Sequence, residues 1–194
     1  PGRALHLRVW RLQVGRVPIF LMDADIPENN LSDCQLTARL YTGDREARIS
    51  QELVLGVGGV RALRALGIHP SVWHMNEGHS AFMIVERLAE RVVAGSDFES
   101  AVASVRASTV FTTHTSVAAG NEVFAEDLID KYLSSYRERV GLQREAFMEL
   151  AEVAGPHGRM FSLPTLALRC SGLRNGVSSL HARVSRRMWH HLWP

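Results

Sequence analysis

Residues 73–82 read Trp-His-Met-Asn-Glu-Gly-His-Ser-Ala-Phe, and this stretch decides the fold class. An apolar strand over 70–76 ends in a turn at Glu77-Gly78, and a helix follows from about 80 to 93. A second helix over 98–108 leads into a β-branched strand over 109–114. Strands separated by helices are typical of a parallel α/β sheet, which is therefore the predicted fold class.

Regular elements are also predicted on both sides of this unit. Upstream, the sequence predicts strands over 8–14 and 17–23, a loop over 23–33 and a long helix over 45–66. Downstream, it predicts helices over 123–139, 144–153, 164–173 and 176–189, with a loop over 155–159. The composition indicates no second domain, so we treat 1–194 as one unit.

The composition excludes several classes of protein. The 194 residues are 46% hydrophobic and 22% charged, as in a globular protein, and no run of about 18 apolar residues predicts a membrane span. The net charge of +2 comes from charges mixed along the chain, so it demands no nucleic-acid partner. Cys34 and Cys170 fit no metal or redox spacing and indicate reduced thiols in a cytoplasmic protein. The start at Pro1, without a Met, indicates the cut end of a longer polypeptide or an engineered boundary.

Polar side chains follow the two strands over 70–76 and 109–114. Asn76, Glu77 and His79 follow the first strand, and His114 follows the second together with several threonines. Ligands of open α/β sheets bind beyond the carboxyl ends of the strands, and this mixture of donors and acceptors suits a polyol such as a sugar. The alternative is that these groups cap the following helices, because an acidic residue such as Glu77 is favourable at a helix N-terminus.

A zinc site is a competing interpretation of the same residues. His74, Glu77, His79 and His114 offer three imidazoles and a carboxylate, which zinc accepts. Helical zinc motifs place two histidines four residues apart on one face, whereas His74 is predicted on a strand and His79 beyond a turn. The spacing therefore disfavours a metal, and we predict none.

Two further motifs have a ligand-binding and a structural interpretation. Gly56, Gly58 and Gly59 lack the Gly-Lys-Ser/Thr ending of a phosphate loop and lie within a helical pattern, which favours close helix packing or a break in the helix. A basic group near the C-terminus is explained better by the end of an amphipathic helix than by a nucleic-acid patch. It consists of Arg186, Arg187, His190 and His191.

Several segments, in order along nearly the whole chain, resemble the α-glucan (glycogen and maltodextrin) phosphorylases, and most of all their shorter bacterial and archaeal branch. Residues 73–82 resemble a Trp-His-Leu-Asn-Glu-Gly-His segment of that family. Residues 112–120, Thr-Thr-His-Thr-Ser-Val-Ala-Ala-Gly, resemble its Thr-Thr-His-Thr-Pro-Val-Pro-Ala-Gly. The Glu-x-Arg-x-x-Gln-Glu pattern at 46–52 and the segments 166–169, 175–181 and 184–194 also match. Ser116 and Ala118 replace two family prolines, which loosens the loop beside His114.

The resemblance implies a fold, a reaction and a set of partners. The implied fold is an incomplete Rossmann-like N-terminal domain of a two-domain, B-type glycosyltransferase (GT-B), covering 1–194. The family catalyses reversible phosphorolysis of α-1,4-glucan ends to glucose 1-phosphate, with pyridoxal 5'-phosphate held by a lysine of the C-terminal domain. Lys131, the one lysine of this sequence, matches no cofactor motif, so the cofactor lysine is expected to be absent. The implied partners are the glucan, phosphate and the missing C-terminal domain, with a homo-oligomer through an unpaired sheet edge.

Two functions follow from the same resemblance. The first is a fragment of a phosphorylase, inactive without its C-terminal domain. The alternative is a non-catalytic truncated remnant that binds maltodextrin weakly at most.

The resemblance also implies a substrate-binding set of four residues. His114 matches a histidine that lies against the transferred sugar, and Glu77 takes the place of an acidic residue near the same sugar. His79 and Asn76 match their neighbours in that segment. Their implied role is positioning and electrostatic stabilisation of an oxocarbenium-like transition state.

The helix around 46–52 adds weaker candidates, Asp44 and Arg48. For Arg48, Gln51 and Glu52 the favoured interpretation is a structural network of buried polar groups.

Overall fold

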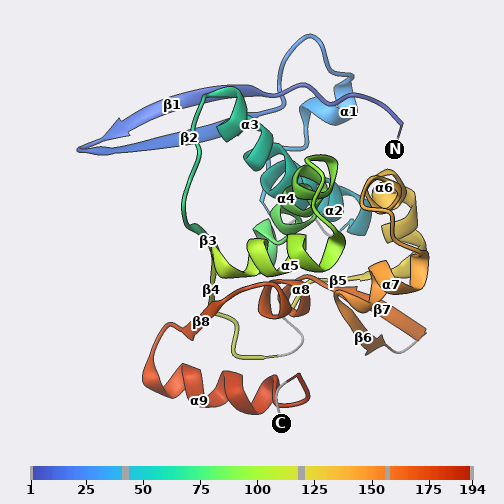
Figure 1. Ribbon diagram of the computed structural model, residues 1–194. Helices are drawn as coiled ribbons and strands as arrows, with labels where there is room; N and C mark the ends of the chain where they lie inside the picture. The colour runs from blue at the N-terminus through green and yellow to red at the C-terminus, as the bar shows by residue number, and fades with distance from the viewer. Residues whose placement is uncertain (1, 41–43, 118–120, 156–157, 193–194) are drawn as a thin grey trace.

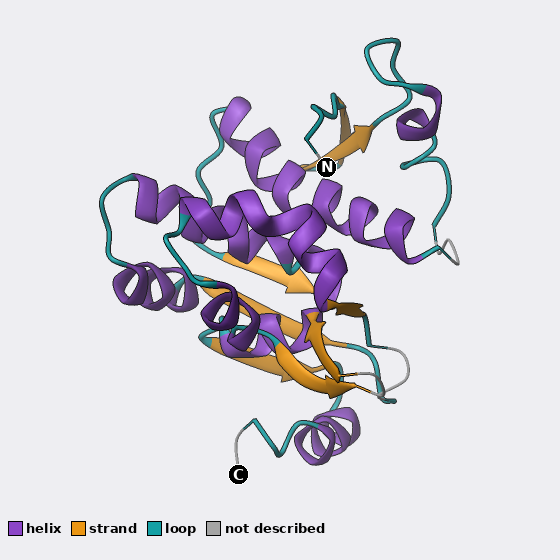
Figure 2. Cartoon of the chain, turned by 90° about the vertical axis from the view of Figure 1, so that its right-hand side faces the viewer, coloured by secondary structure: helices purple, strands orange, loops and turns teal. Residues whose placement is uncertain are grey.

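The computed structural model describes residues 2–40, 44–117, 121–155 and 158–192, which form a mixed α/β fold around a parallel sheet (Figure 1). This sheet has the strand order β3 (Trp73–Asn76), β4 (Thr109–Thr113) and β8 (Leu173–Gly176). Helices α4 (Phe82–Val93) and α5 (Phe98–Ala107) connect β3 to β4. They lie above the sheet in Figure 1, and α9 (Ser179–Met188), which follows the edge strand β8, lies below that strand (Figures 1 and 2). The predicted α/β class with a parallel sheet is confirmed.

Alternating side chains of the strands direct the core toward α4 and α5. In β3, Trp73 and Met75 are buried while His74 and Asn76 are exposed. Helix α4 buries most of its residues, because it is covered on several sides by neighbouring elements. The largest fully buried side chains of the described residues include Phe82, Phe111, Phe124, Phe161, Ile49, Met75, Ile84 and Leu88.

A second, antiparallel sheet was not predicted. It has the order β5 (Val123–Ala125), β7 (Gly158–Ser162) and β6 (Glu152–Gly155). The predicted helix over 123–139 is α6 (Glu126–Arg139), and that over 144–153 ends early as α7 (Arg144–Glu149). The predicted loop over 155–159 is occupied on both sides by strand, and residues 156 and 157 lie outside the described part. Strands of three to five residues carry too little periodicity to be recognised, and distant pairs such as Phe124 with Phe161 stabilise them.

The C-terminal part is also corrected. The predicted helix over 164–173 ends at Arg169, as α8 (Leu163–Arg169). Strand β8 was missed, because its four residues Leu-Arg-Asn-Gly look like a loop until they pair with β4. The predicted helix over 176–189 accordingly begins later, as α9.

The predicted helix over 45–66 consists of three joined helical segments. They are α2 (Arg45–Leu53), the π-helical turn η1 (Val54–Gly58) and α3 (Gly59–Ala65). A Cβ on Gly56 would lie 2.7 Å from the backbone nitrogen of Met83, so the glycine allows α4 to approach this closely. Close packing is therefore confirmed as the role of this glycine. The predicted loop over 23–33 is wrong at its end, where α1 (Leu31–Cys34) begins.

Strands β1 (Arg8–Val14) and β2 (Val17–Asp23) form the predicted hairpin, which projects away from the body of the molecule (Figure 1). Gly15 in its turn has φ +58°, a conformation that favours glycine. In the described ranges, no helix combines the length and the apolar character that crossing a bilayer requires. Cys34 and Cys170 are free and buried, and the cytoplasmic location stays a prediction.

Candidate functional site

Strands β3 and β4 end at one edge of the sheet, as predicted, and β8, which was not predicted, ends at the same edge. Asn76 at the end of β3 is level with Thr112, and Thr113 at the end of β4 is level with Gly176 of β8. The chain leaves β3 through Glu77 into the short 3-10 helix η2 (Gly78–Ser80), and it leaves β4 through His114. We call this edge the rim.

Glu77 fixes the segment that follows β4. Its Oε2 accepts the backbone N–H groups of His114 (2.7 Å) and Thr115 (2.8 Å) and the hydroxyl of Thr115 (3.0 Å). The hydroxyl of Thr113 lies 3.4 Å from Oε1. A carboxylate that accepts two backbone N–H groups acts as a rigid clamp, because hydrogen bonds to an ionised acceptor are stronger than neutral ones. The His114 backbone is therefore positioned by a residue 37 places earlier in the chain.

The backbone of Glu77 is itself unusual. Its φ is +70° and its ψ is 177°, and it is the one non-glycine residue with positive φ in the described part of the chain. Such a conformation costs about 1–3 kcal/mol and persists where the surroundings impose it. Its N–H donates to the carbonyl of Thr112 at 2.9 Å, which continues the β3–β4 ladder. Glu77 occupies the N-cap position of η2, but its side chain makes no cap hydrogen bond there and is directed to the segment after β4 instead.

A ladder of polar groups crosses the rim from β3 to β8. The Thr112 hydroxyl donates to Oδ1 of Asn175 at 2.9 Å, so its oxygen is left to accept from Nε2 of His74 at 2.7 Å. This assigns the proton to Nε2 of His74. Sequence reasoning placed the threonines of this segment at the rim but gave Asn175 no place there, and the parallel register sets Thr112 and Asn175 side by side.

His79 contacts a residue of α2. Its Nδ1 lies 3.6 Å from Oε1 of Glu52, whose side chain is 2% exposed. The same Oε1 forms an ion pair with Nη2 of Arg48 at 3.0 Å. The same Arg48 nitrogen contacts Oε1 of Glu122 at 3.0 Å. The Glu52 carboxylate raises the pKa of His79, and burial raises the pKa of Glu52. The predicted network around Arg48 and Glu52 is thus present, and it extends to the half-buried His79.

The four sequence-derived site residues fall into two groups. Glu77 and His114 are in direct contact, and exposed Asn76 is adjacent to Glu77 at the end of β3. His79 belongs to the Glu52 network instead. Asp44 caps α2 by accepting the N–H groups of Glu46 and Ala47, which is a structural role.

The zinc interpretation has no support in this geometry. His74 is bound to Thr112, His79 faces Glu52, and Glu77 is bound to the backbone after β4. Over the described ranges, no three His, Cys, Asp or Glu side chains gather in a way that would hold a metal ion.

A cavity of about 630 Å³ opens beside the rim, between β4, β8 and α9. Its lining includes Thr113, Asn175, Ser178 and Trp189. Gly176 lets α9 approach this edge, because a Cβ there would lie 2.7 Å from Nδ1 of His181. The rim therefore borders an open cavity on the side of α9.

The basic group near the C-terminus fits the end of α9. Arg186 and Arg187 lie in the last turn, where cations interact favourably with the helix dipole. His190 contacts the carbonyl of Arg187 at 2.9 Å. This arrangement agrees with the interpretation that the sequence favoured, the end of an amphipathic helix rather than a nucleic-acid patch.

Comparison with known proteins points to one family. The chain is 45% identical to a glycogen phosphorylase of Mycobacterium tuberculosis, in an alignment that covers 97% of the chain and 23% of the relative. It is 41% identical to a maltodextrin phosphorylase of Thermococcus litoralis, over 98% of the chain and 22% of the relative. This chain is a homologue of part of the glycogen and maltodextrin phosphorylases. A glycogen phosphorylase of Aquifex aeolicus matches at 28% identity over 97% of the chain. No family model matches.

The homology confirms the resemblance to the phosphorylases and sets its extent. The chain spans between 22% and 27% of the length of these phosphorylases. Of the two positions where prolines of the phosphorylase pattern are replaced, Ser116 lies in the described loop after His114, and Ala118 lies outside the described residues.

Proposed function

We propose that this chain forms the glucan-facing part of the catalytic cleft of a phosphorylase. In a complete enzyme the reaction would be reversible phosphorolysis of α-1,4-glucan ends to glucose 1-phosphate. We further propose that the α/β unit is an incomplete Rossmann-like N-terminal domain of a GT-B fold, completed by a C-terminal domain. The observation that carries this proposal is the clamp between Glu77 and the backbone of His114 and Thr115 at the rim.

The roles of the rim residues follow from their contacts. His114 is exposed, so its imidazole is available to the hydroxyl groups of a sugar. Oε2 of Glu77 already accepts three donors, which leaves mainly Oε1, with its single long contact, for a sugar hydroxyl. Glu77 is therefore first a positioning residue for His114, and its negative charge lies near the place where an oxocarbenium-like positive charge would develop. Exposed Asn76 adds a donor and an acceptor beside it.

His79 acts less directly. Its contact with Glu52 orients the imidazole, and the raised pKa keeps it cationic to higher pH than a free histidine. A cation at this place would attract the phosphate or the hydroxyl oxygens of a substrate.

The residues of this chain do not fit the pyridoxal phosphate of the family. A Schiff-base lysine needs a lowered pKa and a sheltered site. Lys131 on α6 instead forms an ion pair with Glu46, which raises its pKa, and its side chain is 45% exposed. These residues therefore supply no step that involves the cofactor, and we propose that its lysine belongs to the C-terminal domain.

The direct test is a chimera in which this chain replaces the homologous segment of the Mycobacterium tuberculosis glycogen phosphorylase. We expect glucose 1-phosphate formation from maltodextrin, and His114→Ala should lower kcat/KM at least about tenfold, or about 1.4 kcal/mol. His69→Ala is the matched control, because exposed His69 precedes β3 at the opposite end of the strand. An unchanged kcat/KM in the His114 variant would remove this residue from the site.

The isolated chain separates the fragment from the weak-binding remnant. We expect no turnover from the 194-residue chain, even with pyridoxal phosphate added, and measurable turnover would contradict the proposal that the catalytic half lies elsewhere. If the chimera is inactive while the isolated chain binds maltodextrin in calorimetry, the non-catalytic alternative is supported.

A further inference from the structure

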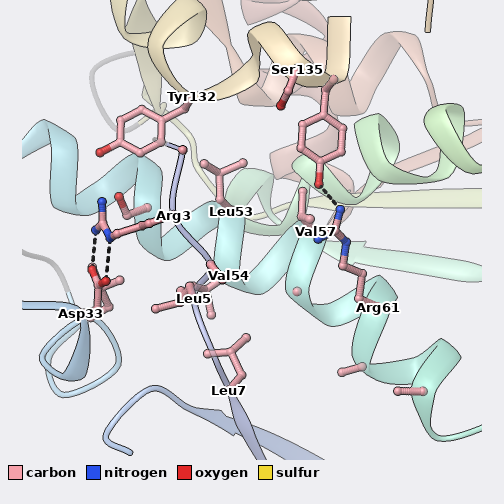
Figure 3. Close-up of a pocket in the computed structure, with 18 of the residues that line it drawn as sticks. Arg3, Leu5, Leu7, Asp33, Leu53, Val54, Val57, Arg61, Tyr132 and Ser135 are labelled. Carbon is pink, nitrogen blue, oxygen red and sulfur yellow. Dashed lines mark hydrogen bonds and ion pairs between the residues drawn. The ribbon is translucent and has the colours of Figure 1, made fainter. Parts of the chain in front are cut away.

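Two described cavities differ in how their polar groups are satisfied. The first, of about 590 Å³, lies between the N-terminal segment and the helical unit α2–η1–α3 (Figure 3). Its charged side chains are paired inside the chain. Nε of Arg3 donates to Asp33 at 2.7 Å, and Nη2 of Arg61 donates to the hydroxyl of Tyr136 at 2.8 Å (Figure 3). These groups need no ligand to satisfy them.

The second cavity, of about 630 Å³, extends from the rim along α9, and we call it the α9 cavity. Its lining includes Thr113 and Asn175 at the rim and Trp189 just after α9. The stretch from Ser178 to Trp189 corresponds to about 16 Å of helix, so the far end of the cavity lies well away from the rim. Cavities of about 300–1,000 Å³ are of the size that holds small molecules.

The buried part of the α9 cavity is apolar and contains one unsatisfied donor. Phe111, Leu168 and Trp189 contribute buried side chains to its lining. The indole Nε1 of Trp189 is buried and has no hydrogen-bond partner among the described residues. A buried N–H group without a partner is costly, and a ligand in the cavity can supply the acceptor that it lacks. An apolar body that carries an acceptor therefore suits this part of the cavity.

Positive charge gathers around the α9 cavity. Arg174 and Arg186 line it, and none of its described lining residues is Asp or Glu. Residues 153–194 contain six arginines and neither Asp nor Glu. Burial and the nearby Arg106 lower the pKa of Arg174, because a second cation disfavours its charged form. An anion in the cavity would offset this repulsion.

Arg186 and Trp189 are placed to hold the same group. They are three residues apart at the end of α9 and both line the cavity, so their side chains share one face of the helix. A carboxylate can accept from a guanidinium and an indole N–H at the same time. A neutral sugar fits less well, because its hydroxyls also donate and the described lining has no carboxylate to receive them. A phosphate ion fits less well, because it has no apolar part to cover the buried lining.

We propose that the α9 cavity binds a small monocarboxylate with an aromatic body. The aromatic body packs against Phe111 and Leu168, and the carboxylate accepts hydrogen bonds from Arg186 and Trp189. The inference does not rest on the proposed function, because it concerns a ligand other than the glucan and is tested in the isolated chain.

Proton–nitrogen correlation NMR of the 194-residue chain, with phenylacetate as the probe, tests the proposal. We expect a saturable shift of the Trp189 indole N–H signal, with a dissociation constant in the millimolar range or tighter for a ligand of this size. Trp189→Phe identifies this signal by its loss. Phenylacetamide, which has the same shape without the charge, should bind at least about tenfold more weakly. Inorganic phosphate, which has the charge without the aromatic body, should also bind at least about tenfold more weakly.

Three variants test the assigned contacts. Arg186→Gln should weaken phenylacetate binding at least about fivefold and leave phenylacetamide binding unchanged. Arg187→Gln is the matched control and should change neither, because Arg187 is an exposed cation of the same last turn but is not among the residues that line the cavity. Ala182 lines the cavity, so the larger side chain of Ala182→Leu should weaken the binding of both compounds at least about fivefold.

Several outcomes would overturn the proposal. One is the absence of a saturable shift of the Trp189 signal up to about 20 mM phenylacetate. Equal affinity for phenylacetamide would indicate a purely apolar site, and equal affinity for phosphate would indicate a general anion site. Equal losses in Arg186→Gln and Arg187→Gln would indicate diffuse attraction by the basic surface. Shifts centred on the amides of His114 and Thr115 would place the probe at the rim instead. Circular dichroism checks that each variant folds, which is expected for the two exposed arginines.

Discussion

The parallel sheet at the rim and the β1–β2 hairpin are both made of β-strands, and they satisfy their side chains in opposite ways. At the rim, polar groups find partners inside the chain, and the apolar side of β3 and β4 is covered by α4 and α5. In the hairpin, the backbone pairs locally while one apolar face remains exposed. The comparison shows that strand pairing alone does not stabilise a sheet. Its apolar face must also be buried, because this burial provides most of the stability.

The largest difference should appear when a large apolar side chain is removed from each region. Phe111 of β4 is fully buried, so Phe111→Ala should lower the free energy of unfolding by about 3–5 kcal/mol. Trp10→Ala in the hairpin should lower it by less than about 1 kcal/mol, since half of this side chain is already in water. Urea unfolding at low protein concentration measures both. Equal losses would mean that the face of the hairpin that carries Trp10 is covered within the monomer.

The second-largest expected effect is the loss of stability when the Glu77 clamp is removed. Glu77→Gln removes the charge and one of the two acceptor oxygens, and should lower the free energy of unfolding by about 1–2 kcal/mol. Hydrogen exchange of the His114 and Thr115 amides should become at least about tenfold faster, because both N–H groups depend on this carboxylate. Glu99→Gln, on the exposed side of α5, serves as the control. If these two amides keep their protection in Glu77→Gln, something other than the carboxylate positions His114.

The smallest effect is a pH dependence at the His79–Glu52 contact. The pKa of His79 is raised above 6.5, so its stabilising contribution is complete below that pH and is lost as the pH rises through the raised pKa. The pKa of Glu52 is raised above 4.5 by burial, so ionising it in the folded state also lowers stability as the pH rises. Because the His79 side chain is 38% exposed, we expect its share to be below about 1 kcal/mol.

Thermal unfolding between about pH 5 and pH 9 measures this dependence. In His79→Gln, the melting temperature should depend less on pH in the upper part of this range. The dependence at lower pH, which comes from Glu52, should remain. If the melting temperature of His79→Gln depends on pH as in the original chain, His79 makes no stabilising contact with Glu52.

Sequence reasoning succeeded where the pattern is local. Alternation predicted the hairpin, and the apolar spacing of 45–66 predicted a helical unit, although its π-helical turn was not foreseen. It failed at β5, β6, β7 and β8. Strands β5 and β8 pair only with strands far along the chain, and β6 and β7 form a hairpin too short to show a clear alternation. At the site it identified Glu77 and His114 together, since both follow strands of one parallel sheet. It placed the threonines around His114 at the rim without their partners, and it gave Asn175 no place there, because these side chains form their contacts only across strands.

The amino-acid sequence by itself determined the homology to the phosphorylases, the alternation of helices and strands, and the polar composition of the rim. Only the tertiary structure decided that Glu77 holds the backbone after β4 and that His79 faces Glu52. The physical reason is that hydrogen bonds and ion pairs act over a few ångströms, and only folding brings together residues that lie 27 to 38 positions apart in the sequence.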